Sequence, residues 1–346
     1  MKNIKIGNRI IGDGNPVFIV AEIGSNHNQD YDLALEHIEK AADAGVDAVK
    51  FQTFKANKHV SKYAEMPSYL NESQTIHELI ESLELNRSWQ KNLKSYSESK
   101  GLVFFSSPCD YDAVDSLEKI NVDAHKVASF DLPDLDLIRY ISKTLKPIIL
   151  STGMADINEI KRAIDVSIKE KNDKIIVLHC TSIYPAPTEL SNLKAMLQIK
   201  DTFDVIVGYS DHTIGDTIAI AAVSMGALMI EKHFTVNKKL PGPDHSFAIE
   251  PNELRIMVDK IREIEAAFGD GEKNGPRNEE LEMYKKVRRS IHARKNIKSG
   301  EIIKEDMLEI KRPGYGIEPY KKNEIIGKKV KENILADHWI TEDMIE

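Results

Sequence analysis

Several features are scarce in this chain, and each absence excludes a class of protein. The 346 residues contain only 2 cysteines, Cys109 and Cys180, which lie far apart and form no CxxC pair. We therefore expect a reducing compartment and no disulfide framework. No apolar run approaches the roughly 18 residues of a membrane-spanning helix, and the first residues lack the apolar core of a signal peptide. These absences predict a soluble protein of the cytoplasm.

Positive charge is also in the minority. The chain has 47 lysines and arginines against 55 aspartates and glutamates, and its formal net charge is −8. This charge argues against nucleic acid and acidic membrane surfaces as partners, because both repel an acidic protein. An anionic ligand must then be bound by local lysines and arginines. Apolar residues make up 41% of the chain, which is enough for a sizeable core.

The chain does contain a regular alternation of short apolar runs and amphipathic stretches. Helical patterns such as 32–44 and 157–170 separate most of the runs. Alternating units of this kind build a parallel sheet, and eight of them predict a (β/α)8 TIM barrel. An open sheet is the alternative, although no glycine-rich nucleotide loop follows the first strand. The predicted strands are 17–21, 48–51, 103–106, 125–128, 147–150, 175–179, 205–208 and 227–231.

The barrel pattern ends with a predicted helix over 251–268, so we expect a barrel domain at residues 1–270. A polar, charged linker is predicted at 271–286. Residues 287–346 contain short strand-like runs and few apolar residues. They predict a small, mostly β module that cannot build a large core and packs against another surface.

Two histidines follow the last two predicted strands of the barrel, His212 and His233. Neighbouring strands lie roughly 5 Å apart, so both imidazoles would lie over one mouth and could share a divalent cation. Asp211 and Glu231 stand beside them, and Asp244 could return as a third ligand. The alternative is two ordinary histidines, one capping a helix and one in a loop.

Asp244 itself stands in a loop, which the turn signal Pro241-Gly-Pro243 predicts. The next residue, His245, is expected to face solvent in this loop. In the C-terminal module, Arg312 lies in a turn built by proline and glycine. An arginine in such a turn can reach a carbonyl or carboxylate, although composition alone favours a solvated charge.

The other polar residues at the strand ends share one face. Residues two apart on a strand point the same way, so Lys50 and Gln52 face the interior, as do Glu22 and Lys126. Glu22 suits orientation or proton transfer. The alternative is a set of internal ion pairs without function, which would cost on the order of several kcal/mol per unpaired ion. The lysines suit a phosphate or carboxylate together with the hydroxyls of Ser106, Ser107, Ser129, Ser151 and Thr152.

Eight motifs, in order along the chain, resemble the sialic acid synthase family. The last stretch, with Arg288-Arg-Ser-Ile-His-Ala293, resembles that family's antifreeze-like (SAF) domain. The resemblance implies a transferase that condenses phosphoenolpyruvate with an N-acetylated hexosamine in polysaccharide biosynthesis. The motifs are Glu22-Ile-Gly-Ser-Asn-His27, Lys50-Phe-Gln-Thr53, Ser106-Ser-Pro108, Leu150-Ser-Thr-Gly153, His179-Cys-Thr-Ser-Ile-Tyr-Pro185, Ser210-Asp-His212, Glu231-Lys-His233 and Pro241-Gly-Pro-Asp244.

The resemblance also implies a substrate and a set of site residues. The default acceptor is open-chain N-acetylmannosamine, which with water would give N-acetylneuraminate and phosphate. Manganese or magnesium would be held by His212 and His233, and Arg312 would reach the N-acetyl group of the sugar from the partner protomer of a domain-swapped homodimer. Phosphoenolpyruvate would be held by Lys50, Lys126, Ser107, Ser129, Ser151 and Ser210. Sugar, metal or water would be contacted by Glu22, Gln52, Asn71, Tyr184 and Asp244.

The sequence departs from the N-acetylneuraminate synthases after Lys126. Those relatives usually read Gly-Ser-Gly-Glu, with the glutamate in the sugar site, whereas this chain reads Ala128-Ser-Phe-Asp131. Asp131 keeps the carboxylate but reaches less far, and Phe130 adds bulk. The Ala-Ser-Phe run resembles pseudaminic acid synthases, while Pro243-Asp-His-Ser246 resembles legionaminic and spore-coat polysaccharide relatives.

Three alternatives therefore stand beside N-acetylmannosamine condensation. One is the same reaction on a diacetamido-trideoxy-hexose. Another is a metal-dependent lyase or hydrolase on the same barrel, which would need no pair of lysines such as Lys50 and Lys126. The third is a non-catalytic carbohydrate- or ice-binding protein, against which the charged, lysine-rich C-terminal module counts.

Overall fold

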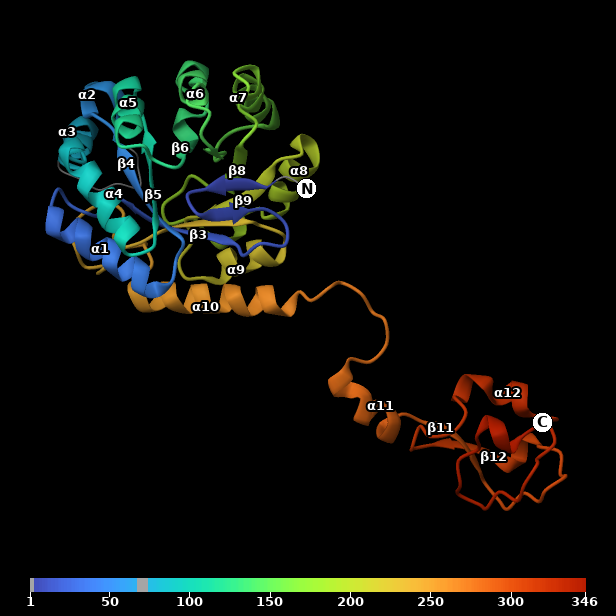
Figure 1. Ribbon diagram of the computed structural model, residues 1–346. Helices are drawn as coiled ribbons and strands as arrows, with labels where there is room; N and C mark the ends of the chain where they lie inside the picture. Colours follow the sequence, from blue (N-terminus) through green and yellow to red (C-terminus); the bar gives the residue numbers. More distant parts are fainter. Residues whose placement is uncertain (1–2, 67–73) are drawn as a thin grey trace. The chain divides into compact units, whose positions relative to one another are not determined.

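The computed structural model describes residues 3–66 and 74–346, and the chain forms two compact units, Met1–Gly269 and Asp270–Glu346. In the first unit, eight parallel strands close into a barrel in chain order, and the last strand pairs with the first (Figure 1). This confirms the predicted (β/α)8 barrel. The strands are β3 (Phe18–Gly24), β4 (Ala48–Thr53), β5 (Val103–Pro108), β6 (His125–Val127), β7 (Ile148–Ser151), β8 (Ile175–Cys180), β9 (Ile206–Asp211) and β10 (Met229–His233).

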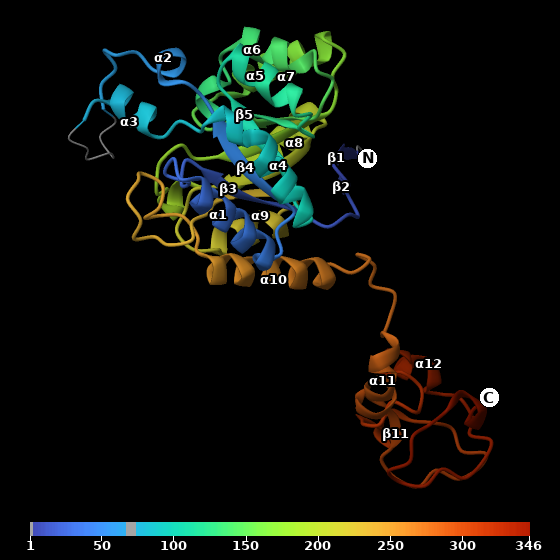
Figure 2. The same cartoon turned by 60° about the vertical axis from the view of Figure 1, so that its left-hand side comes forward.

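A ring of helices covers the outside of the barrel, and apolar side chains of strands and helices form the main core between the two layers. Figure 2 shows α2 and α3 beyond this ring, at one end of the barrel. The helices of this unit are α1 (Tyr31–Ala44), α2 (Ala56–His59), α3 (Ile76–Ser82), α4 (Gln90–Ser99), α5 (Tyr111–Lys119), α6 (Leu135–Ser142), α7 (Ile157–Lys169), α8 (Lys194–Phe203), α9 (Thr217–Ser224) and α10 (Pro251–Ala267).

Local signals begin and end these helices where the sequence places them. The Asp30 side chain accepts hydrogen bonds from the N–H groups of Asp32 and Leu33 at the start of α1. Gly45 ends that helix with a φ of 86°, a conformation that is strained for other residues. The chain can therefore turn sharply back into β4.

The barrel interior is apolar at one end and polar at the other. On β4, Ala48 lies in the inner core, whereas Lys50 and Gln52 come later on the same face. On β10, Met229 lies in the inner core and is followed by Glu231 and His233. Because residues two apart share a face, each strand runs from a packed floor to a polar mouth.

An N-terminal hairpin, β1 (Ile4–Ile6) and β2 (Arg9–Ile11), was not foreseen from the sequence. Ile4, Ile6 and Ile11 of the hairpin pack with the inner core residues of the barrel. Figure 2 shows the hairpin at the opposite end from α2 and α3. It therefore closes the apolar end, which leaves the other end as the only mouth among the described residues.

The second unit has a core of its own. Two antiparallel strands, β11 (Ser290–Ala293) and β12 (Leu308–Lys311), pack with buried isoleucines from the later turns. The module, which was not expected to build a large core, thus has a small one. Two further helices lie in this unit, α11 (Leu281–Val287) and α12 (Lys322–Ile325), so part of the predicted linker is helical.

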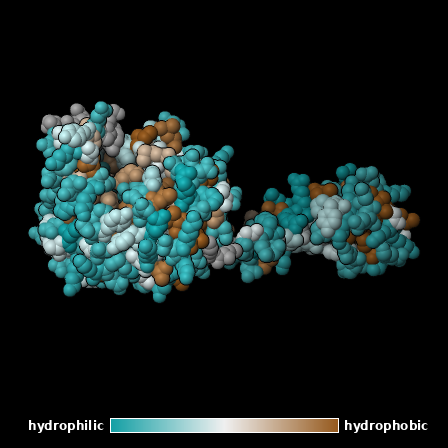
Figure 3. Space-filling view, turned by 90° about the horizontal axis from the view of Figure 1, so that it is seen from above, coloured by the Kyte–Doolittle hydropathy of each residue, from teal (hydrophilic) through white to brown (hydrophobic). Residues whose placement is uncertain are grey.

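None of the helices in the described part of the chain is long and apolar enough to cross a membrane. In Figure 3 most of the visible surface is hydrophilic, and hydrophobic residues gather around a hollow on the barrel unit.

Candidate active site

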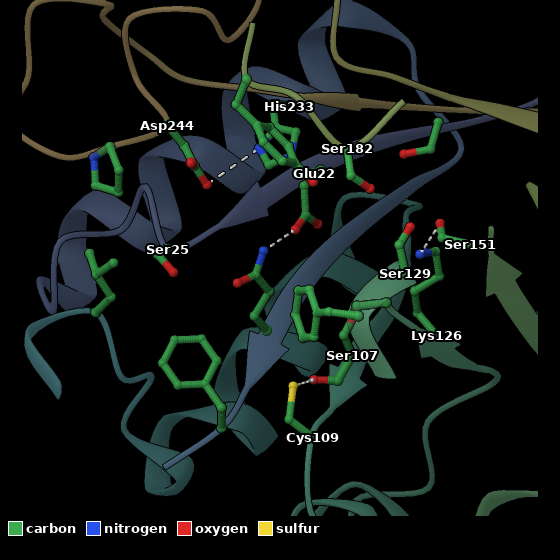
Figure 4. A pocket seen from close by; sticks show the side chains of 18 of the residues that line it. Glu22, Ser25, Ser107, Cys109, Lys126, Ser129, Ser151, Ser182, His233 and Asp244 are labelled. Atoms are coloured by element: carbon green, nitrogen blue, oxygen red, sulfur yellow. Dashed lines mark hydrogen bonds and ion pairs between the residues drawn. The ribbon is translucent and has the colours of Figure 1, made fainter. Parts of the chain in front are cut away.

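A cavity of about 270 Å³ opens at the polar end of the barrel. Its walls differ in character (Figure 4). One wall is charged and comes from the strand ends, with Glu22, Lys50, Lys126 and Glu231. Another part of the lining is apolar and is formed by Phe54, Ile76, Leu79, Ile80, Leu83, Phe130 and Met154. A ligand in this cavity would meet both charge and hydrocarbon.

Lys50 is the centre of the charged wall. Its Nζ lies 3.0 Å from Glu22 Oε2 and 3.5 Å from Glu231 Oε1, and it donates a hydrogen bond to Ser107 Oγ at 3.2 Å. Burial lowers the pKa of Lys50, but the charges of Glu22 and Glu231 outweigh it and raise the pKa above its ordinary value. Lys50 is therefore a fixed ammonium group.

Lys126 supplies a second ammonium group on the same wall. Its Nζ donates a hydrogen bond to Ser151 Oγ at 2.6 Å and lies 3.8 Å from Glu231 Oε1 (Figure 4). Burial lowers the pKa of Lys126, and the nearby Glu231 only partly offsets this. A bound anion with several negative charges would offset the effect of burial and favour the charged form of Lys126.

Glu22 and Glu231 lie in different surroundings. Burial raises the pKa of Glu22 despite Lys50 and despite the 2.8 Å hydrogen bond that Gln52 Nε2 donates to it. Burial also acts on Glu231, but Lys126 and Lys50 outweigh it and lower the pKa. Glu231 is thus the stable anion between the two lysines, and Glu22 is the carboxyl group that can exchange a proton.

Small hydroxyl groups surround the lysines. Ser129 Oγ accepts a hydrogen bond from the Gly153 N–H at 3.1 Å and lies 3.2 Å from Cys180 Sγ. Gly153 has no room for a side chain, because a Cβ would collide with Ser182 Oγ. Ser210 Oγ donates to Glu231 at 3.3 Å. These donors suit the oxygens of a phosphate group.

The two histidines lie together at the mouth, with ring centroids 5.4 Å apart. Thr181 O accepts a hydrogen bond from His212 Nδ1 at 2.7 Å, which leaves the lone pair on Nε2, 3.4 Å from Ser210 Oγ. Burial lowers the pKa of His212 to about 4. Burial, followed by the nearby charges, lowers the pKa of His233 well below its ordinary value. Both rings are therefore neutral near pH 7, as metal ligands must be.

Asp244 lies beside this pair. Its Oδ2 is 3.5 Å from His233 Nδ1, which is buried and has no hydrogen-bond partner among the described residues. Burial and the charge of Glu22 raise the pKa of Asp244 to about 7. Two imidazoles and a carboxylate fit a divalent cation, although their ligand atoms do not all lie within 4.8 Å of one another.

The aromatic ring of Tyr184 packs against both histidines, at 4.3 Å from His212 and 5.9 Å from His233 between centroids. Asp131 lies in the turn after β6, next to Cys109, and burial raises its pKa to about 7. Asp131 does not line the cavity itself. Arg312 is exposed on the second unit.

Most of the predicted site residues line the cavity. Asn71 lies outside the described residues. The predicted residues that line the cavity are Glu22, Lys50, Gln52, Ser107, Lys126, Ser129, Ser151, Tyr184, Ser210, His212, His233 and Asp244.

Four expectations about neighbouring side chains are wrong. His245 is fully buried, because its ring nitrogens contact Thr235 and Asn28. Asp211 does not support His212, since it pairs with Lys232 at 2.7 Å on the outer face of the sheet. The hydroxyls of Ser106 and Thr152 also bond elsewhere, to Thr53 and the backbone.

Sequence reasoning missed four polar residues of the cavity, Ser25, His59, Cys109 and Ser182, and the whole apolar wall. Ser25 and Ser182 stand inside recognised motifs, so their positions directly after strands were a usable signal. The apolar wall comes largely from the segment between β4 and β5, where nothing in the periodicity indicates which face meets the cavity.

Comparison with known proteins gives the family. The NeuB family model matches residues 37–273 and the SAF domain model residues 288–346. The N,N'-diacetyllegionaminic acid synthase of Campylobacter jejuni is 42% identical over 94% of this chain and 98% of that protein. The human N-acetylneuraminate-9-phosphate synthase is 34% identical over 98% and 95%. A sialic acid synthetase structure from Leptospira borgpetersenii covers 82% of this chain and 95% of its own, with 35% identity and a TM-score of 0.75.

The barrel and its charged mouth, together with these relatives, define a synthase of the phosphoenolpyruvate-dependent transferase class. The chain belongs to the NeuB family and carries a C-terminal SAF domain. The resemblance inferred from the eight motifs is thus confirmed.

Proposed function

We propose that this protein condenses phosphoenolpyruvate with the open-chain aldehyde of an N-acetylated hexosamine to give a nonulosonate and phosphate. The observation that carries the proposal is the pair of ammonium groups of Lys50 and Lys126, 4% and 2% exposed, in a cavity that also holds two neutral imidazoles. Lys50 is already paired with Glu22 and Glu231, whereas Lys126 is only partly compensated by Glu231 and would gain most from a bound anion.

Phosphoenolpyruvate occupies the charged wall. Lys50 and Lys126 bind its carboxylate and phosphate, and the hydroxyls of Ser107, Ser129 and Ser151 complete the contacts, together with that of Ser210. Glu231 holds both lysines in place before the substrate arrives, because it lies 3.5 Å from Lys50 and 3.8 Å from Lys126. The binding site is therefore organised in advance.

The acceptor lies across the mouth, with its aldehyde toward His212 and His233. These two residues, with Asp244 beside them, would hold a manganese or magnesium ion. Such an ion polarises the aldehyde oxygen. Tyr184 packs against both rings and limits their rotation. Gln52 and Asn71 contact sugar or water.

The reaction forms one carbon–carbon bond and one carbon–oxygen bond to water, and it breaks the carbon–oxygen bond to phosphate. C3 of phosphoenolpyruvate attacks the aldehyde carbon, water adds at C2, and phosphate leaves by cleavage of its bond to C2. Glu22 accepts the proton of the attacking water. This role suits a buried carboxyl group whose pKa is raised and whose position is set by Gln52.

Two observations favour a diacetamido-trideoxy-hexose over N-acetylmannosamine, the acceptor expected first. The higher identity is to a legionaminic acid synthase, 42% against 34% for the human N-acetylneuraminate-9-phosphate synthase. The wall that includes Phe130 and Leu79 is apolar, which suits a methyl group and a second acetamido group better than free hydroxyls.

The second unit completes the site of another copy. Arg312 is exposed in the turn after β12 and binds the N-acetyl oxygen of the sugar in the partner's barrel. The protein is then a domain-swapped homodimer of the cytoplasm. These statements rest on the family resemblance of the Lys311-Arg-Pro-Gly314 run.

The test is release of inorganic phosphate from phosphoenolpyruvate with manganese, using N-acetylmannosamine, its 6-phosphate and a diacetamido-trideoxy-mannose or -altrose in parallel. Release with one sugar, abolished by a chelator and restored by manganese, supports the proposal and names the acceptor. Release with none of them contradicts it and favours the metal-dependent lyase.

A further inference from the structure

A second cluster of metal-binding side chains lies at the cavity, apart from the two histidines. In the described part of the chain, His59, Cys109 and Asp131 are the one set of three such residues whose ligand atoms all lie within 4.8 Å of one another. His59 is the last residue of α2, Cys109 follows β5, and Asp131 lies in the turn after β6. Three successive loops of the barrel therefore meet at one point.

The cluster faces the cavity from the side opposite the histidine pair. His59 and Cys109 line the cavity. Figure 4 shows Cys109 across the cavity from His233 and Asp244. A ligand bound to the cluster would therefore keep one side open to the space that the acceptor occupies.

The Cys109 thiol and the Asp131 side chain interact with each other, and the cluster has few polar partners beyond its own members. Asp131 Oδ2 is buried and has no hydrogen-bond partner among the described residues. The hydrogen bond from Cys109 Sγ to Ser107 O is long, at 3.9 Å. A buried carboxylate oxygen without a partner costs free energy that a bound cation would recover. The unpartnered oxygen is therefore independent support for a ligand here.

The position of the His59 ring is set by its neighbours. It stacks on Phe54 with centroids 5.4 Å apart and meets Phe130 edge-on at 5.1 Å. A ring packed on two aromatic side chains loses little further entropy when it binds a metal. The histidine is thus arranged before binding.

We propose that His59, Cys109 and Asp131 form a second cation site, selective for a thiophilic divalent ion such as Zn²⁺. One nitrogen, one sulfur and one oxygen match the ligands that zinc accepts, with a fourth position open to the cavity. Manganese and magnesium prefer oxygen, so the thiolate separates this site from the histidine pair. Binding exchanges the thiol proton of Cys109 for the metal.

The geometry requires only a small closure. Tetrahedral zinc with bonds of about 2.0–2.3 Å holds its ligand atoms roughly 3.6 Å apart. The separation of up to 4.8 Å must therefore shrink by about 1 Å.

A cation at this site would occupy the acceptor side of the cavity, which gives a functional consequence that rests on the proposed function. Zinc should inhibit the manganese-loaded enzyme in competition with the acceptor sugar, because the sugar and the ion share that space. It should not compete with phosphoenolpyruvate, whose wall is on the strand ends. Binding of the ion itself does not depend on the proposed function.

The binding test uses Co²⁺ as a probe on the full chain, because a cobalt–thiolate bond has a near-ultraviolet charge-transfer absorption. One thiolate-bound Co²⁺ per chain is expected in the wild type, and Zn²⁺ should displace it. The band should vanish in Cys109→Ser and persist in Cys180→Ser, the matched control for the other thiol, and in His233→Ala. Persistence in Cys109→Ser, or loss in Cys180→Ser alone, would overturn the proposal.

A second variant guards against a folding defect in Cys109→Ser. His59→Asn should weaken Co²⁺ binding by about 10-fold or more, while His338→Asn in the second unit leaves it unchanged. Equal affinity in both variants contradicts the site. In the kinetic arm, Cys109→Ser should abolish the zinc inhibition that competes with the sugar. If no acceptor supports phosphate release, the proposed function fails, while the cobalt signal still decides the metal site.

Discussion

Lys126 on β6 and Lys232 on β10 are both buried lysines of barrel strands, yet they face opposite sides of the sheet. Lys126 Nζ reaches Ser151 in the cavity at 2.6 Å, whereas Lys232 Nζ reaches Asp211 outside the barrel at 2.7 Å. Each is 2% exposed. The two lysines are therefore equally buried. The side of the sheet that each one faces makes Lys126 a binding group and Lys232 a structural group.

This contrast predicts different effects of the same substitution. Lys126→Met should lower kcat/KM for phosphoenolpyruvate by about 100-fold or more, because one of two charge-assisted contacts to the anion is lost. Lys232→Met should leave the KM for phosphoenolpyruvate unchanged. It should instead lower the free energy of unfolding by about 3–5 kcal/mol, because Asp211 is left buried without its partner. Initial rates of phosphate release and urea denaturation measure the two effects, and an unchanged KM in Lys126→Met would contradict the assignment.

His233→Ala should abolish turnover and weaken manganese binding while the fold stays intact. The imidazole is neutral and its Nδ1 has no hydrogen-bond partner in the described residues, so its loss removes a ligand and ring contacts such as those with Tyr184 and Phe247. Manganese titration by electron paramagnetic resonance and a thermal melt would check both parts. Activity equal to that of the wild type would refute the metal assignment.

Phe130→Gly should shift the preference among acceptors toward N-acetylmannosamine. The Phe130 ring lies on the apolar wall, 5.1 Å from the His59 ring, and its removal opens space and exposes polar surroundings. The ratio of kcat/KM for N-acetylmannosamine to that for the diacetamido sugar should rise by about 10-fold or more. Parallel assays with the two sugars give this ratio, and Met154→Leu, on the same wall, is the matched control. An unchanged ratio would place the determinant elsewhere.

Arg312→Ala should raise the KM for the sugar by about 10-fold or more and leave the KM for phosphoenolpyruvate unchanged, because the guanidinium binds the acceptor. Arg294→Ala, in the same unit, should change neither. Mixing Arg312→Ala with His233→Ala should restore part of the activity, since a mixed dimer has one complete site. Effects on phosphoenolpyruvate alone, or no restored activity, would contradict the placement of Arg312 in the partner's site.

Acid should destabilise the barrel unit between pH 6.5 and 4. Burial lowers the pKa of His37 from its ordinary 6.5 to about 4, and the hydrogen bond that Nδ1 donates to Leu33 O only partly offsets this. Nε2 accepts the Val236 N–H, a contact that a proton on Nε2 would break. The unfolded chain binds a proton below pH 6.5 and the folded chain does not, so stability is full above that pH and falls toward pH 4. Urea midpoints against pH should show this slope, reduced in His37→Gln and unchanged in His338→Gln. The same slope in His37→Gln would assign it to other groups.

The position of Lys50 shows what the alternation of residues along a strand can predict. Alternation along 48–52 placed Lys50 and Gln52 on one face, and the structure has both on the cavity. The same rule put Glu231 with His233 and, had it been applied to Asp211, would have turned that residue outward. Rules of this kind succeed because the period of a strand does not depend on what surrounds it.

Loops behave differently, as His245 and the segment between β4 and β5 show. His245 is buried because Thr235 and Asn28, one of them far away in sequence, close around it. Phe54 and Leu79 meet the cavity because the chain after β4 folds back over the mouth. Neither result follows from composition or period, since a loop has no repeating geometry.

The amino-acid sequence alone determined the eight strands, the end of the barrel that carries chemistry and the family, because these depend on local periodicity and on motifs that follow strands. Only the tertiary structure decided that Asp211 forms an ion pair with Lys232 and that the N-terminal hairpin closes the apolar end of the barrel. The same is true of the cluster formed by His59, Cys109 and Asp131. Each of these joins residues from separate loops or strands, and their meeting depends on packing between elements.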